Sequence, residues 1–541
     1  MKTLAVLFCG ELTHHSFIPL SDGRVAFERA LSAMLGLPGV ERCLILSSER
    51  RHNGYPSPDR ARLESVAARL DPGMGKVRLV SRERWDVSAL FTALVAESEG
   101  YDNVAFSFGD QPHVDPSFSR SLHERHERYA AEYTFADGYP VGIAPEYLAR
   151  GILPVLERLS AESRDPVTRS TLFDTIKKDI NSFDIETDIA PVDLRHLRLT
   201  LACDTRQGLE LSTALDGITA DTYAEIVRDR AASLRVSPNF YAVQVASRCP
   251  FECVYCPYPA YCAASSPKGT GRKPTELDSL ADPLAFASLM ERVARFSETA
   301  VVSLSLWGEC SYHDRLPELF SSVLSHLGLS ILLETTGIGW SDETLATLAG
   351  IVRDAGPRMD GKRPIDWIVS IDATSPSRYA ALRGLGGDKE SEGEALFREA
   401  TSFVGRLASL FPESVWPQTV RMNDNEEELE GFYRHWKDEV GRVIVQKHDH
   451  FCKSIEDRRV ADLSPLDRHP CWHIKRDMSI LIDGTVPLCR EDLYAARSFG
   501  NAYNDDLSSI WARFQPVYEQ HLESDFKGMC GACDEFYTCN F

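Results

Sequence analysis

Three cysteines stand close together in the middle of the chain, in the run Cys249-Pro-Phe-Glu-Cys253-Val-Tyr-Cys256. Three thiolates in so short a loop can wrap one iron–sulfur cubane and leave its fourth iron without a protein ligand. An open iron suits a cluster that must bind a small molecule rather than only transfer electrons. The alternatives are a zinc site, for which Cys262 could supply a fourth ligand, and a disulfide or buried core cysteines.

A second group of cysteines closes the chain: Cys471, Cys489, Cys530, Cys533 and Cys539. The segment around them has little room for a hydrophobic core, and a domain of this kind is usually held together by metal or disulfides. Two pairs of cysteines would also suit a structural zinc ion. The Asp483-Gly484 pair between the apolar runs 478–482 and 485–488 predicts a β-hairpin here.

The composition limits the class of protein. The chain has 541 residues, 14 cysteines and a formal net charge of −21. This length suggests about three domains, and the acidic balance argues against binding to nucleic acid, since a phosphate backbone requires basic groups. No run of about 18 apolar residues predicts a membrane span, and residues 1–10 are predicted as a buried strand rather than a signal peptide. Patterned cysteines in such a chain favour metal ligation in a reducing cytoplasm.

Short apolar runs alternate with helical patterns through residues 1–225. Strands are predicted at 3–8, 43–46, 77–80 and 103–108, and helices at 26–35 and 58–70. This alternation is typical of an α/β domain with a mainly parallel, Rossmann-like sheet.

Six strand–helix units follow in residues 226–455. Their strands are predicted at 240–246, 300–306, 329–334, 366–371, 416–422 and 442–446. Units of this spacing predict a partial, TIM-like (βα)6 barrel, in which chemistry takes place at the carboxyl ends of the strands. The Cys249 loop follows the first of these strands directly. The cysteine-rich residues 456–541 are the predicted third domain.

The cysteine loop resembles the signature of the radical S-adenosylmethionine (SAM) enzymes, in which an aromatic residue, here Tyr255, precedes the third cysteine. Later stretches are similar to that family in order and spacing: Leu306-Trp-Gly308-Glu309, Thr335-Thr-Gly337, Ser370-Ile-Asp372, and Tyr379 with Arg383-Gly384. Trp307 and Cys310 depart from the glycine and proline of the usual Gly-Gly-Glu-Pro motif. For Ser370 and Asp372, capping of the following helix is the alternative.

This resemblance implies a reaction. A [4Fe–4S] cluster on Cys249, Cys253 and Cys256 would bind SAM, and one electron would cleave it to a 5′-deoxyadenosyl radical that abstracts hydrogen from a substrate. The implied cofactor-binding residues are Tyr255, Gly308, Glu309, Thr335, Ser370 and Asp372. The substrate is unknown, whether peptide, protein or sugar-like, and the electron would come from a reductant such as ferredoxin or flavodoxin.

The C-terminal cysteines resemble the auxiliary-cluster domain called SPASM, or its shorter relative called twitch. The resemblance implies one auxiliary [4Fe–4S] cluster on Cys471, Cys489, Cys530 and Cys533, with Cys539 as a spare or exchanging ligand. Two further cysteines of the full SPASM pattern are absent, because the sequence stops at Phe541.

The N-terminal domain resembles the sugar nucleotidyltransferases of the cytidylyl type. Gly109-Asp110-Gln-Pro112 and Asp204-Thr205 are among the matching stretches. The loop after the first strand, 10–16, holds neither arginine nor lysine, although a triphosphate requires cationic donors. We therefore expect a domain that has lost nucleotidyl transfer. With the radical core, this arrangement resembles radical SAM/SPASM proteins of spirochaetes.

Two other functions fit parts of the pattern. A bifunctional enzyme would add active nucleotidyl transfer in the N-terminal domain, and Asp110 would then be a metal ligand. A non-enzymatic iron–sulfur or zinc scaffold would use the cysteines for structure and the N-terminal domain for recruitment. Cleavage of SAM under reductant separates the radical enzyme from the scaffold.

Overall fold

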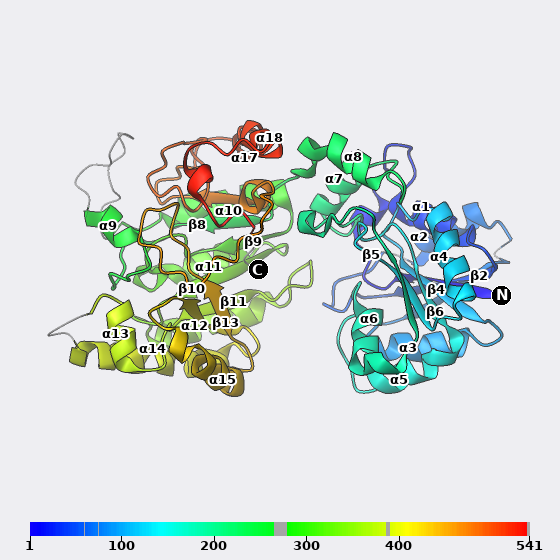
Figure 1. The fold of residues 1–541 in the computed structure, drawn as a ribbon, viewed down its shortest axis with the longest axis horizontal. Coiled ribbons are helices and arrows are strands. Elements are labelled where there is room, and N and C mark those ends of the chain that lie inside the picture. The colour runs from blue at the N-terminus through cyan, green and yellow to red at the C-terminus, as the bar shows by residue number, and fades with distance from the viewer. Residues whose placement is uncertain (59, 74, 264–278, 386–389, 538–541) are drawn as a thin grey trace. The chain divides into compact units, whose positions relative to one another are not determined.

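The computed structural model describes residues 1–58, 60–73, 75–263, 279–385 and 390–537 (Figure 1). The chain folds into two compact units, 1–234 and 235–541. The predicted boundaries at 225 and 455 remain predictions.

Unit 1 is built on a seven-stranded sheet with the order β3-β2-β1-β4-β6-β5-β7. The strands are β1 (Thr3–Cys9), β2 (Val40–Ser48), β3 (Val77–Arg82), β4 (Asn103–Phe108), β5 (Tyr133–Asp137), β6 (Glu146–Ala149) and β7 (Ile185–Ile189). Only β6 runs antiparallel to its neighbours β4 and β5. The predicted mainly parallel α/β sheet is thus confirmed, and all of β1 is buried.

Helices with an apolar stripe pack against this sheet, α1 and α4 among them. The helices are α1 (Ala26–Leu35), α2 (Arg60–Leu70), α3 (Val87–Glu97), α4 (Pro116–Arg128), α5 (Leu153–Ser160), α6 (Thr171–Ile176), α7 (Arg206–Ala214) and α8 (Tyr223–Asp229). In α1, the buried Phe27, Leu31 and Met34 recur at the spacing of one helix face. Asp115 starts α4 by accepting hydrogen bonds from the backbone N–H groups of Ser117 and Phe118.

Unit 2 contains an all-parallel sheet with the order β13-β12-β11-β10-β9-β8-β14. The strands are β8 (Phe240–Val243), β9 (Ala300–Ser303), β10 (Leu329–Thr335), β11 (Ile365–Ser370), β12 (Val415–Arg421), β13 (Ile444–Lys447) and β14 (Asp477–Ile480). The first six are the strands of the predicted partial barrel, which is confirmed. Side chains alternate between its two faces: Tyr241 packs toward the helices, whereas Phe240 and Ala242 pack with strand residues on the opposite face.

The helices of unit 2 follow their strands in the order expected for βα units. They are α9 (Tyr258–Ala263), α10 (Pro283–Ser297), α11 (Leu316–Leu324), α12 (Asp342–Ala355), α13 (Pro376–Leu382), α14 (Glu390–Leu410), α15 (Leu429–Val440), α16 (Trp472–Arg476), α17 (Leu507–Ala512) and α18 (Gln515–Leu522). Among the described residues, every helix is too short or too polar to traverse a bilayer.

The predicted C-terminal hairpin is wrong in its pairing. Gly484 has the left-handed φ of 84° that a turn requires, and the Leu481 N–H donates to the Thr485 carbonyl at 2.9 Å. The first arm, however, is β14, which joins the barrel sheet parallel to β8. The second arm exchanges backbone hydrogen bonds with residues 499–500 instead. Joining the sheet lets Met478 and Ile480 be fully buried, which a free hairpin cannot do.

Candidate active site

The loop of Cys249, Cys253 and Cys256 starts at the carboxyl end of β8, and all three cysteines are partly buried. The end of α13 fixes its middle, because the N–H groups of Glu252 and Val254 donate to carbonyls at Arg383 (3.3 Å) and Leu382 (3.0 Å). The β9 end fixes its start, where the Glu309 N–H donates to the Arg248 carbonyl at 2.7 Å. The loop is therefore held between two barrel segments.

Two glycines let these segments approach the loop. A Cβ on Gly308 would lie 2.2 Å from the carbonyl oxygen of Ala246, and one on Gly384 would lie 2.4 Å from that of Glu252. Both glycines also have left-handed φ values, +81° and +74°. Backbone cannot yield as a flexible side chain would, so both positions require glycine.

A buried arginine lies directly behind the loop. The Arg383 Nη1 group donates to Cys253 Sγ at 3.3 Å and to the Tyr255 hydroxyl at 2.6 Å. Its Nη2 group donates to the Asp372 carboxylate at 3.0 Å, and the Tyr255 hydroxyl donates to the same carboxylate at 2.7 Å. The side chains of Arg383 and Asp372 are 2% and 0% exposed, so this ion pair is screened little by water. One cation thus links a cysteine to a strand end.

The predicted residue Asp372 is fully engaged inside the protein. Besides Arg383 and Tyr255, its carboxylate accepts the Val420 N–H at 2.8 Å, and its backbone has a left-handed φ of 64°. The carbonyl of Ser370 accepts a hydrogen bond from Arg383. Neither residue caps α13, whose N-cap is Ser375, so the capping alternative is wrong.

Two predicted residues lie in contact: Glu309, in the loop after β9, and Thr335, the last residue of β10. The Thr335 hydroxyl donates to the Glu309 carboxylate at 2.7 Å, and the N–H and hydroxyl of Thr336 donate to its other oxygen, each at 2.7 Å. Glu309 is 2% exposed. The structure thus brings Gly308, Glu309 and Thr335 together beside the cysteine loop.

Burial disfavours the ionised form of two loop thiols, Cys249 and Cys256. Burial, with the nearby Cys253 charge, raises the pKa of Cys249 to about 12 and raises that of Cys256 further. Protonated thiols in a desolvated loop make poor nucleophiles, whereas iron displaces their protons outright. Three converging sulfurs fit the donor set of an iron–sulfur cluster.

The C-terminal cysteines also converge. Burial first, then the charge of Glu491, and then the charges of Cys533, Cys471 and Cys530 raise the pKa of Cys489. Cys471 is the N-cap of α16, and Cys530 lies in the 3-10 helix Gly528–Ala532. Cys539 lies outside the described residues. Four cysteines from three segments of the chain therefore meet inside unit 2.

Cys452 joins this group, and the sequence pattern gave no sign of it. Its thiol interacts with Cys533, which is the largest cause of its raised pKa, and burial and the charges of Cys533, Glu491 and Cys489 add to the shift. Phe451, Cys452 and Lys453 all have left-handed φ values, between 47° and 67°, which side-chain-bearing residues rarely adopt in succession. The unusual turn points to a constrained segment beside the cysteines.

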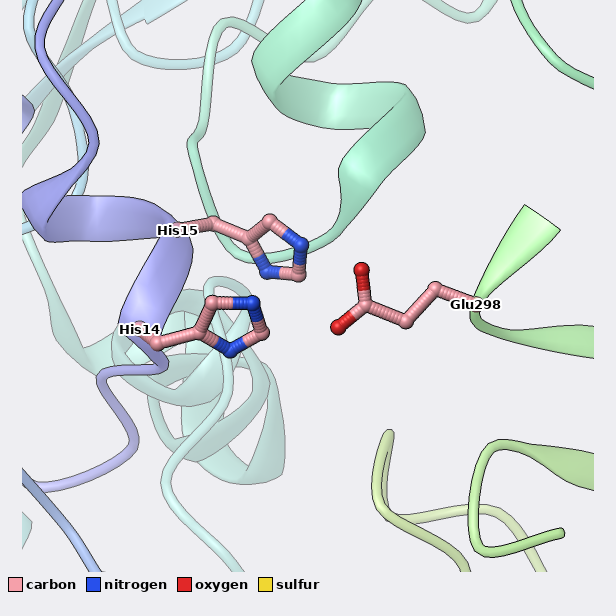
Figure 2. Close-up of side chains that lie close together, drawn as sticks. All are labelled: His14, His15 and Glu298. Carbon is pink, nitrogen blue, oxygen red and sulfur yellow. The ribbon is translucent and has the colours of Figure 1, made fainter. Parts of the chain in front are cut away.

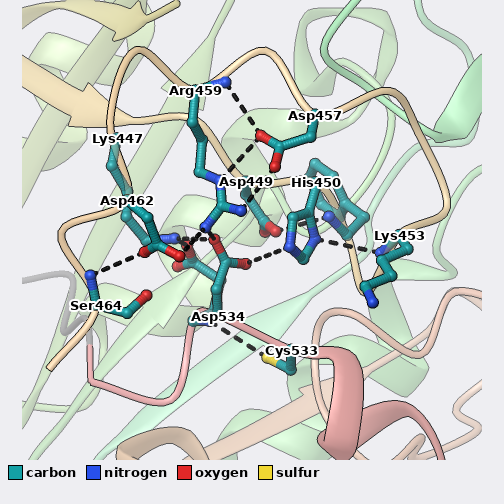
Figure 3. A network of polar contacts seen from close by, with 12 residues as sticks. Lys447, Asp449, His450, Lys453, Asp457, Arg459, Asp462, Ser464, Cys533 and Asp534 are labelled. Carbon is teal, nitrogen blue, oxygen red and sulfur yellow. Dashed lines mark hydrogen bonds and ion pairs between the residues drawn. The ribbon is translucent and has the colours of Figure 1, made fainter. Parts of the chain in front are cut away.

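A polar network fixes the residues after Cys533 (Figure 3). Lys447 Nζ pairs with Asp534 at 3.0 Å and also with Glu535, and Arg459 pairs with Asp534 at 3.1 Å. His450 Nε2 lies 3.6 Å from Asp534, while its Nδ1 accepts the Lys453 N–H at 3.2 Å. Since Nδ1 accepts, Nε2 carries the proton of the neutral ring. The network is thus an ion-paired support for the cysteines.

Aromatic contacts connect the two cysteine groups. The Trp307 ring stacks on Tyr258, just after Cys256, with centroids 5.8 Å apart. It also contacts Phe451, next to Cys452, at 5.6 Å. Both groups therefore border one aromatic wall within unit 2.

In unit 1, Asp110, the metal ligand of the bifunctional alternative, is paired with an internal cation. The Arg169 guanidinium donates to both oxygens of Asp110, at 3.1 and 2.7 Å, and to Asp204 at 3.1 Å. The loop after β1 contains His14 and His15, whose ring centroids lie 4.0 Å apart (Figure 2), where a triphosphate would need arginine or lysine. Asp110 thus already has its counter-charge.

Comparisons with known proteins agree with this arrangement. Residues 471–535 match the SPASM family, described as an iron–sulfur cluster-binding domain. An uncharacterized protein of Treponema pallidum (strain Nichols) is 43% identical over 376 residues, 69% of this chain and 99% of that protein. The predicted SPASM resemblance is confirmed, and Cys471, Cys489, Cys530 and Cys533 lie within the matched iron–sulfur cluster-binding domain.

Two solved structures match parts of the chain at low identity. BtrN in complex with AdoMet and 2-DOIA is 16% identical, covering 56% of this chain and 93% of its own, with a TM-score of 0.32. A cytidylyltransferase from Leptospira borgpetersenii is 14% identical, covering 43% of this chain and 95% of its own, with a TM-score of 0.34.

Proposed function

We propose that this chain, which belongs to one family with the Treponema pallidum protein, cleaves SAM reductively to start radical chemistry on a substrate. It combines a SPASM domain with a cysteine loop that resembles that of the radical SAM proteins. The observation that carries the proposal is the loop of Cys249, Cys253 and Cys256. It lies against Gly308-Glu309 on one side and is backed by Arg383 on the other.

The three cysteines would hold a [4Fe–4S] cluster. When bound, the cluster supplies one electron to SAM, which breaks a carbon–sulfur bond and gives a 5′-deoxyadenosyl radical for hydrogen abstraction. The residues of the chain position these parts. Arg383 holds the loop through Cys253 and Tyr255, and Glu309 holds the end of β10 through Thr335.

The second cysteine group would hold one auxiliary [4Fe–4S] cluster on Cys471, Cys489, Cys530 and Cys533. Convergence of these four thiols supports this ligand set. We also propose that the electron is delivered by a small protein reductant of the ferredoxin or flavodoxin type. Unit 1 would not transfer nucleotides, since the Arg169 guanidinium is already paired with both Asp110 and Asp204.

Anaerobic reconstitution tests the proposal. We expect iron and sulfide near two cubanes per chain, and 5′-deoxyadenosine from SAM under dithionite. Cys253→Ala should abolish cleavage, whereas the control Cys262→Ala should retain it, because Cys262 lies nearby but outside the three-cysteine loop. Zinc as the sole bound metal, with no SAM cleavage, would instead identify a structural scaffold.

A further inference from the structure

Unit 1 contains a cavity of about 320 Å³ at the carboxyl end of β4, bordered by β5, the start of β6 and α6. This is the end of a parallel sheet where ligands bind in open α/β folds. The volume suits a small organic molecule. The iron–sulfur chemistry proposed above does not require this cavity, so the kind of ligand that it binds is a separate question.

The cavity is unsuited to anions. Arg169 is the one arginine or lysine among the described residues that line it. Its guanidinium is held between Asp110 and Asp204, two carboxylates against one cation. A phosphate or carboxylate ligand would therefore meet excess negative charge, without the free cationic donors that anion binding requires.

One wall of the cavity carries a carboxylate in an apolar setting. Glu146, the first residue of β6, lines the cavity and accepts a hydrogen bond from the Tyr133 hydroxyl. Burial raises the pKa of Glu146 to about 7, since a desolvated negative charge lacks a counter-ion. A bound cation would supply that counter-ion.

The other walls are aromatic. Tyr133, Phe135 and Phe173 form a continuous group, with centroids 5.1 Å apart for the first pair and 5.5 Å for the second, and Tyr139 also lines the cavity. Phe135, Tyr139 and Phe173 are only partly buried. Aromatic faces attract cations, most strongly where water is excluded. We propose that this cavity binds a small organic cation, an amine or an N-methylated ammonium, between the aromatic rings and Glu146.

Titration of the full chain with two probes of similar shape tests this site. Tetramethylammonium carries the charge, and tert-butanol is its neutral counterpart. At pH 8, with ionic strength held constant by sodium chloride, calorimetry should show saturable tetramethylammonium binding at least about tenfold tighter than that of tert-butanol. Inorganic phosphate should neither bind nor compete.

Variants locate the binding in the cavity. Glu146→Gln can keep the hydrogen bond from Tyr133 while removing the charge, and it should weaken tetramethylammonium binding about tenfold. Phe173→Leu should also weaken it, whereas Glu99→Gln, an exposed change before the amino end of β4, should not. The proposal would be overturned by any of four results: tetramethylammonium binds no more tightly than tert-butanol, it shows no saturable binding, phosphate competes with it, or both cavity variants bind it with unchanged affinity.

Discussion

The guanidinium of Arg383 lies 3.3 Å from the sulfur of Cys253, although the two residues are 130 positions apart in the chain. The same side chain binds Asp372 and Tyr255, so it connects a cluster-loop cysteine to the end of β11. Hydrogen bonds to ligating sulfurs raise the reduction potential of iron–sulfur clusters. Arg383 thus acts on the loop both as a support and as a source of positive charge.

Arg383→Met should therefore lower the midpoint potential of the SAM-binding cluster and slow 5′-deoxyadenosine formation. It should also destabilise unit 2 by roughly 3–5 kcal/mol, because the Asp372 carboxylate would remain buried without its partner. Adding Asp372→Asn should restore much of the stability but not the potential, as measured by an EPR-monitored redox titration. Arg378→Met, on the same helix with a partly exposed side chain, is the matched control. An unchanged potential in Arg383→Met would contradict the electrostatic role.

Gly384 provides a second prediction, because its Cβ position meets the Glu252 carbonyl at 2.4 Å. Gly384→Ala should displace the cysteine loop and lose iron from that site during desalting. Gly361→Ala has the same left-handed strain, with φ +84°, but nothing within 4 Å of its Cβ. It should cost only about 1–2 kcal/mol in unfolding free energy and keep its iron. Equal iron loss in both variants would point to backbone strain rather than to the close approach.

Cys452 lies beside Cys533 but outside the matched residues 471–535. We expect Cys489→Ser to lose one cubane, about four of about eight irons per chain. Cys452→Ser should keep the full iron content, since four other cysteines complete the auxiliary site. Iron and sulfide analysis decides between them; loss of four irons in Cys452→Ser would place this residue among the ligands.

The sequence predicted those parts of the site that depend on local order. The cysteine loop follows β8, Gly308-Glu309 lies in the loop after β9, and Thr335 ends β10. Successive βα units place these positions at one edge of the barrel. Tyr379 and Arg383-Gly384 were identified only by their similarity to the family's sequence, which assigned them no contacts. The sulfur contact of Arg383 depends on how α13 packs against a distant loop, which spacing does not encode.

Other features could not be predicted because they depend on long-range pairing. The Asp483-Gly484 turn was correct, but the partner of β14 is set by the open edge of β8. Cys452 had no patterned neighbour in sequence, and a strained turn brings it to Cys533. Arg169 belongs to no motif, yet it forms ion pairs with both Asp110 and Asp204 in unit 1.

The ion pairs of Arg169 with Asp110 and Asp204 predict that unit 1 does not transfer nucleotides. The full chain should release no pyrophosphate from CTP in the presence of Mg²⁺. Arg169→Met should leave Asp110 and Asp204 without their cation, so Mg²⁺ should raise the melting temperature of this variant but not that of the unaltered protein. Pyrophosphate release by the unaltered protein would restore the bifunctional alternative.

Glu146 gives unit 1 a pH dependence of a particular sign. Burial raises its pKa from 4.5 to about 7, so between these values the folded state binds more protons than the unfolded state. Stability contributed by this group is therefore greatest below pH 4.5 and is lost as the pH rises to about 7. The buried His113 and His126, with pKa values lowered to about 4, act in the opposite direction.

The difference in unfolding free energy between Glu146→Gln and the unaltered protein isolates the Glu146 contribution, because both proteins contain His113 and His126. Glu146→Gln should gain stability relative to the unaltered protein as the pH rises from 4.5 to 7, by up to about 3 kcal/mol at 1.36 kcal/mol per pKa unit. Urea unfolding followed by a probe in unit 1, at pH values on both sides of this range, measures the difference. Glu99→Gln should show no such trend, since Glu99 is exposed. Tetramethylammonium should reduce the Glu146→Gln difference at pH 8, because a cation in the cavity stabilises the ionised carboxylate of the unaltered protein.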